Sequence, residues 1–212
     1  MFDFLTSDTK PRPLADSPLV QVLAQVKFPK LAKFDKDSLG AFQISLTERY
    51  PLFSEEKEMT FTASPQGVNS TQSPLWKFRD LSSSWTVVLS PEHLAIECTQ
   101  YTEWTDLHDR FKEALDSLSS IISVPARSRI GLRYVNHLDG ATVAERLNLV
   151  APDLLGFGSS RAAQTSSASV HAMSSHTVFR DGDNTLSVRS ATGDELGLPD
   201  GIVIDLDCFS ER

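Results

Sequence analysis

Cysteines, basic clusters and long apolar runs are all scarce in this sequence. Its 212 residues include only two cysteines, and a chain of this length buries a sufficient core without disulfides or metal ions. No apolar run approaches the length of a membrane span, so a membrane is not an expected partner. The N-terminal residues lack a basic start and a small-residue cleavage site, which predicts no export signal and a cytoplasmic location.

Acidic residues outnumber basic ones. The chain carries 20 Lys and Arg against 28 Asp and Glu, a formal net charge of −8. This balance repels a phosphate backbone unless the basic residues gather on one face, and the sequence has no basic cluster. Nucleic acid is therefore not an expected partner.

Motifs that would carry chemistry are also missing. The five histidines form no HExxH pair or other recognisable ligand set. The GFGSS segment at Gly156–Ser160 follows a predicted helix, not a strand, and lacks the lysine of a nucleotide loop. No serine lies in a GxSxG elbow. The sequence thus predicts no catalytic residue, no metal and no cofactor.

The strongest positive pattern is an amphipathic helix over residues 102–122. Its apolar residues recur at spacings of three and four: Trp104, Leu107, Phe111, Leu115, Leu118 and Ile122. Thr102 or Thr105 supplies the expected hydroxyl cap. This pattern predicts one buried face and one solvated face.

Alternating strands surround this helix. Leu94, Ile96 and Cys98 share one predicted strand face, and residues 19–28 form a similar first strand that Pro29 ends. A helix is predicted over 36–50, a Ser/Gln/Asn/Pro-rich loop over 65–74, and a hairpin turn over 81–84.

The second half of the chain repeats this order of elements. A strand over 129–138 precedes a helical segment over 141–155 that Gly156 ends. Polar strands are predicted over 164–173 and 176–179. Two further strands follow, over 184–191 and 201–209.

A shift of 110 positions aligns the two halves. It lays Leu94, Ile96, Glu97 and Cys98 onto Ile204, Leu206, Asp207 and Cys208. We therefore predict an α+β fold of two duplicated β-α-β(4)-α units, with antiparallel sheet and helices packed on one face. The expected organisation is an irregular arm over 1–17, a first repeat over 18–124 and an incomplete second repeat over 125–212.

The second repeat lacks its closing helix in this sequence. We expect either that the sequence is truncated relative to its natural gene, or that a partner helix or a second copy of the chain covers the apolar face of the last strand. Both cysteines are expected to be buried thiols on such apolar faces, and the alternative is a disulfide or redox pair.

Four segments together resemble the TIGR04255 family of bacterial and archaeal proteins: Pro18–Pro29, Arg49–Glu56, Trp85–Trp104 and Gly131–Leu138. The resemblance implies the fold of that family and an accessory role near defence or mobile genes. Members continue through another helix and have no established activity. The repeated unit is also similar to the saddle of TATA-binding-protein-like folds.

Charged and polar residues beside the predicted core are the candidate binding site. They are Glu97, Arg133, Tyr134, Asn136 and Asp207. If their strands are neighbours, Glu97 pairs with Arg133 across the ladder. The alternative is an ordinary cross-strand ion pair with no ligand.

Two hypotheses on function remain open. The first is a non-enzymatic module for a protein partner or for self-association. The second is a small-molecule binder or enzyme with a pocket between the repeats. A deep pocket containing Glu97, Arg133 or Asn136 would favour the second, whereas a flat apolar sheet face would favour the first.

Overall fold

The structure is a computed structural model that describes residues 16–31, 34–64, 67–124, 126–139, 150–156, 172–192 and 201–211. Several predictions fall outside these ranges. They concern the arm up to residue 15, the helix over 141–149, the loop over 157–160 and the strand over 164–171.

Within the described residues, strands and two α-helices form an α+β fold, as predicted. In chain order the elements are β1 (Leu19–Lys27), α1 (Lys36–Leu46), β2 (Leu52–Ser64), β3 (Gly67–Arg79), β4 (Trp85–Leu89), β5 (His93–Cys98), α2 (Trp104–Ile121), β6 (Arg129–Asp139), the 3-10 helix η2 (Pro152–Leu154), β7 (Ser174–Asp181), β8 (Asn184–Thr192) and β9 (Gly201–Glu211). The described residues contribute nine strands to the sheet, in the order β2-β3-β4-β5-β1-β6-β9-β8-β7. No helix in this part of the chain is long and apolar enough to cross a membrane.

Contacts divide the chain into two compact units. Unit 1 comprises Met1–Val22 and Leu132–Ser210, and unit 2 comprises Leu23–Gly131 with Glu211–Arg212. Strands β1 and β6 are therefore each divided between the two units. Each unit has its own sheet region and its own apolar core.

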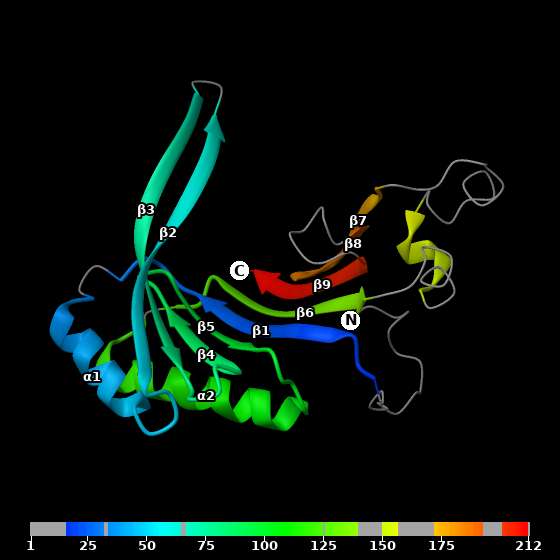
Figure 1. The fold of residues 1–212 in the computed structure, drawn as a ribbon. Coiled ribbons are helices and arrows are strands. Elements are labelled where there is room, and N and C mark those ends of the chain that lie inside the picture. The colour runs from blue at the N-terminus through cyan, green and yellow to red at the C-terminus, as the bar shows by residue number, and fades with distance from the viewer. Residues whose placement is uncertain are drawn as a thin grey trace. The chain divides into compact units, whose positions relative to one another are not determined.

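The core of unit 2 lies between one face of its strands and the two helices (Figure 1). Antiparallel register places Phe78 opposite Val87, and Val87 opposite Ile96. All three side chains are fully buried, because alternate residues of a strand share one face. Helix α1 covers this row through Phe42, whose ring meets Phe78 edge-on with centroids 5.4 Å apart.

Helix α2 forms where the amphipathic pattern predicts it. Its buried residues are Leu107, Phe111, Ala114 and Leu118. Two details of the prediction are wrong. The N-cap is Glu103, without a side-chain cap bond, instead of Thr102 or Thr105. Trp104, expected on the buried face, is 52% exposed because it occupies the first helical position.

Strands β2 and β3 form a long hairpin that corrects the predicted loop over 65–74. Strand β3 begins at Gly67 and pairs with β2 along its length. Strand β4 pairs with β3 over Trp76–Arg79, so the outer part of the hairpin extends away from the rest of unit 2 (Figure 1). Ladder hydrogen bonds hold this polar segment in a strand despite its turn-like composition.

The predicted hairpin turn between β3 and β4 is confirmed. The backbone N–H of Ser83 donates to the Asp80 carbonyl at 3.0 Å, and Ser83 adopts a left-handed φ of +56°. The Asp80 carboxylate accepts hydrogen bonds from the Trp85 N–H and from the Ser82 hydroxyl. These bonds satisfy the donors that the turn leaves free.

Unit 1 contains an antiparallel meander of β7, β8 and β9 (Figure 1). A small core of Val150, Leu155 and Ile202 lies at one end of its sheet. The Ser190 hydroxyl donates to the carbonyl of Leu154, which fixes η2 against β8. Gly156 follows η2 with a left-handed φ of +52°, as expected of a capping glycine.

Candidate functional site

A cavity of about 400 Å³ lies on one sheet face of unit 1. Residues from four strands and η2 line it: Leu132, Tyr134, Asp153, Leu154, Ser175, Thr177, Phe179, Leu186, Val188, Ser190, Leu206 and Cys208. The strand residues alternate in sequence because only every second side chain of a strand faces the cavity.

Cross-strand register arranges these residues in rows. Phe179 pairs with Leu186, and Leu186 pairs with Cys208. In the next row, Val188 stands between Thr177 and Leu206. The floor of the cavity is therefore a nearly continuous apolar strip.

The cavity has one covered end and one exposed end. At the covered end, Leu154 packs against the core of Val150, Leu155 and Ile202. At the other end, Phe179 is 37% exposed. Large apolar side chains that meet solvent beside a concave apolar surface are typical of a binding site.

Cys208 also lies at the exposed end, which corrects the prediction that both cysteines are buried. Cys98 is buried, but Cys208 is exposed, and both are free thiols. Partial burial raises the pKa of the Cys208 thiol, and the neighbouring Asp207 carboxylate raises it further. The sequence placed Cys208 on the apolar face correctly, but its exposure depends on what covers that face.

The five predicted site residues do not form one cluster. Tyr134 lines the cavity, and the Asn136 amide lies 3.4 Å from the Ile204 carbonyl, to which it donates. Asp207 stands opposite Ser187, in the row between Leu186 and Val188 and on the other face of the strands. Glu97 stands opposite Thr86 in unit 2, so its predicted pair with Arg133 would join different units and stays a prediction.

Arg133 binds Asp205, which is not among the five predicted site residues. The Arg133 Nε and Nη2 atoms donate to the two carboxylate oxygens at 2.7 and 2.8 Å. The Asp205 side chain is 7% exposed and that of Arg133 is 43% exposed. Asp205 alternates with Ile204 and Leu206 as a solvent-facing residue would, so the sequence does not distinguish it. Its burial does, because buried carboxylates require a partner.

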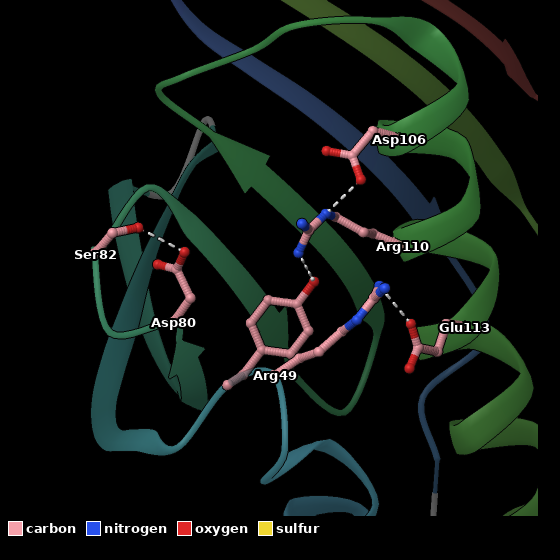
Figure 2. Close-up of polar contacts among 7 residues, drawn as sticks. Arg49, Asp80, Ser82, Asp106, Arg110 and Glu113 are labelled. Atoms are coloured by element: carbon pink, nitrogen blue, oxygen red, sulfur yellow. Dashed lines mark hydrogen bonds and ion pairs between the residues drawn. The ribbon is translucent and has the colours of Figure 1, made fainter.

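A polar cluster in unit 2 ties α2 to the chain that follows α1 (Figure 2). Arg110 donates to Asp106 at 2.8 Å and lies 3.5 Å from the Tyr50 hydroxyl. Its guanidinium stacks over the Trp85 ring, 4.4 Å from the centroid. Burial raises the pKa of Tyr50, so Tyr50 is a neutral hydrogen-bond partner at physiological pH.

The contacts of this cluster hold α2 against the chain that follows α1, which is a structural role. Arg49 and Glu113 form a second link between the same elements, 2.8 Å apart and about half exposed (Figure 2). Arg110 is already held by a carboxylate, a hydroxyl and an aromatic face. Its binding capacity is thus used within the chain.

The lining of the cavity is mainly apolar. Among its described lining residues there is no histidine to activate the Cys208 thiol. No group of three His, Cys, Asp or Glu residues suited to a metal ion occurs within the described ranges. What the cavity offers is apolar contact area with a few hydroxyl groups at its border.

Comparison with known proteins adds no relative. No protein-family model and no curated protein matches the chain.

Proposed function

We propose that this chain is a non-enzymatic protein-interaction module whose contact surface is the apolar groove of unit 1. The groove is the cavity lined by β6, β7, β8, β9 and η2. The observation that carries the proposal is the partial exposure of Phe179 at one end of an otherwise apolar strip. Removal of such side chains from water contributes about 25 cal/mol per Å² of apolar surface before the costs of association are subtracted.

The proposal also states that the fold arose by duplication of one structural unit. Its support is the strand order, in which β3-β4-β5-β1 corresponds to β7-β8-β9-β6, with β2 as an additional edge strand beside β3. The paired positions also correspond, because Trp85 stands opposite Cys98 as Leu186 stands opposite Cys208. A saddle similar to that of TATA-binding-protein-like folds is the architecture we infer from this duplication.

We further propose that the chain belongs to the TIGR04255 family and serves a bacterial accessory or defence system. This rests on the four resembling segments alone. In that role the chain would bind a protein partner or associate with itself.

A second candidate function is the binding of a small apolar molecule. The cavity volume of about 400 Å³ lies in the range of about 300–1,000 Å³ typical of ligand pockets. Tyr134, Ser175 and Thr177 could orient such a ligand through their hydroxyl groups. The cavity contains neither Glu97, Arg133 nor Asn136 among its described lining residues, and we therefore prefer the interaction module.

Adjacent residues of β7 provide a matched test. Phe179 faces the groove, whereas Val178 is 46% exposed and points to the opposite sheet face. We compare the wild-type chain with Phe179→Asp and Val178→Asp. Analytical ultracentrifugation measures self-association, and quantitative co-purification from the host measures partner binding.

The proposal requires an association that Phe179→Asp abolishes and Val178→Asp retains. An association that both variants retain, or the absence of any association, would contradict it. Native mass spectrometry of the purified chain tests the second candidate, since a bound small molecule lost only in Phe179→Asp favours that function instead.

A further inference from the structure

We infer that the groove of unit 1 receives an amphipathic α-helix of a partner protein, laid over the apolar strip that contains Val188, Leu206 and Cys208. This inference rests on the proposed function and specifies the chemistry of the partner. It is carried by what covers the corresponding strip of unit 2.

The two units present their apolar residues in the same ladder positions. In unit 2, Val87 stands opposite Ile96. In unit 1, Val188 stands opposite Leu206, and the row beside it pairs Leu186 with Cys208. A partner that covers one strip thus meets apolar side chains in the same rows as a partner that covers the other, with Leu186 in the place that Trp85 takes in unit 2.

In unit 2 that strip is covered by a helix. Ile96 and Cys98 are fully buried, and α2 packs against β5. The buried face of α2 consists of Leu107, Phe111, Ala114 and Leu118, spaced by four, three and four residues. In unit 1 the residue in the position of Cys98 is Cys208, which is exposed.

The size of the strip suits one helix. Four neighbouring strands about 4.8 Å apart span roughly 14 Å, and an α-helix with its side chains is about 10–12 Å wide. Three rows, from Ser190 to Leu186, extend about 13 Å along the strands. This length corresponds to roughly two and a half helical turns, or three apolar contacts at helical spacing.

An extended segment is a poorer occupant than a helix. Strand β8 already pairs with β7 on one side and with β9 on the other, so its backbone groups are used. A peptide lying on this apolar face must satisfy its own N–H and C=O groups, because unsatisfied ones are costly in an apolar site. An α-helix meets that requirement within itself.

Cys208 provides a reporter of occupancy in the complete chain. It lines the groove and is exposed, whereas the other thiol, Cys98, is buried. The probe is a synthetic peptide with the sequence of Trp104–Ile122, held helical by a hydrocarbon staple between positions 109 and 113, which face solvent in α2. A staple is needed because short isolated helices are marginal in water.

We expect saturating peptide to slow iodoacetamide modification of Cys208 by about tenfold, since alkylation requires access to the thiolate. A control peptide with Leu107→Asp and Phe111→Asp should give no protection. Phe179→Asp in the chain should abolish protection, and Val178→Asp should retain it. Circular dichroism verifies that both variants are folded.

Each alternative outcome overturns a defined part. If neither the stapled peptide nor a stapled version with leucine at all four apolar positions protects Cys208, the helix assignment is wrong. If protection instead rises with chain concentration alone, the occupant is a second copy, and the interaction module stands. Octanoate serves as a small apolar probe. If it protects Cys208, and neither protection by helical peptides nor self-association of the chain depends on Phe179, both the inference and the proposed function fail.

Discussion

Arg133 holds Asp205 through two hydrogen bonds on adjacent strands of unit 1, one to each carboxylate oxygen. Asp205 is nearly buried, so removal of its partner leaves a carboxylate with little access to water. We expect Arg133→Met to lower the free energy of unfolding by about 1–3 kcal/mol, the cost of an unsatisfied buried group. Urea unfolding measures this change.

The double variant with Asp205→Asn separates the pair from other contacts of Arg133. Its loss of stability should be smaller than the sum of the two single losses, because the second change removes the charge that the first leaves unpaired. Additive losses would show that the pair is not coupled. If Arg133→Met keeps full stability but loses a partner, the ion pair serves binding instead.

Arg110 offers a second prediction in unit 2. Arg110→Met removes the bond to Asp106 and the stacking on Trp85, and we expect a loss of about 1–2 kcal/mol. Arg49→Met is the matched control, because the Arg49–Glu113 pair is about half exposed and such pairs contribute about 0–1 kcal/mol. Equal losses in the two variants would show that the contacts of Arg110 contribute no more to stability than the exposed Arg49–Glu113 pair.

The third prediction concerns pH. Burial lowers the pKa of His93 below its ordinary value of 6.5, and Lys27 lowers it further, while Glu58 and Glu92 raise it. As the pH falls, His93 therefore binds a proton more readily in the unfolded chain than in the folded chain. The stability contributed by neutral His93 is full above about pH 6.5 and is lost as the pH falls below that value.

His93→Gln isolates this contribution. The neutral amide can replace the imidazole as a partner of the Ser90 hydroxyl, which lies 2.8 Å from His93 Nδ1. Between about pH 7.5 and about pH 5.5, the urea midpoint of the wild type should fall more than that of the variant. Parallel pH profiles would exclude His93 as the source.

The fourth prediction separates the two thiols. In the native chain, iodoacetamide should modify Cys208 and leave Cys98 protected, because Cys208 is exposed and Cys98 is buried. Mass spectrometry should detect one modified cysteine under native conditions and two in denaturant. In Cys208→Ser, rapid native modification should disappear. Rapid labelling of Cys98 would contradict the packing of α2 on β5.

The sequence predicts those parts of the fold in which one local period dominates. Helix α2 has three- and four-residue spacing over 18 residues, and that periodicity needs no knowledge of neighbouring elements. Strand β3 is different. Its outer residues are polar and turn-like, and they become a strand through pairing with β2, which composition does not encode.

The groove is harder to predict for the same reason. Alternation places Leu206 and Cys208 on one face, but the cavity also needs Tyr134 and Phe179, which lie far away in the sequence. Asp205 was missed because one acidic residue in an alternating strand resembles any solvent-facing position. Only the register and the burial of its side chain identify it as the partner of Arg133.

Strand β2 lies at one edge of the sheet and carries Glu55, Glu56, Lys57 and Glu58 in succession. An unpaired edge is a template onto which strands of other molecules can add, and amyloid-like growth begins in this way. Addition of a second β2 in parallel and in register would place each of these charges beside its own copy, and like charges side by side disfavour pairing. The base of the hairpin, where these residues lie, therefore disfavours the parallel, in-register stacking of β2 that a fibril requires.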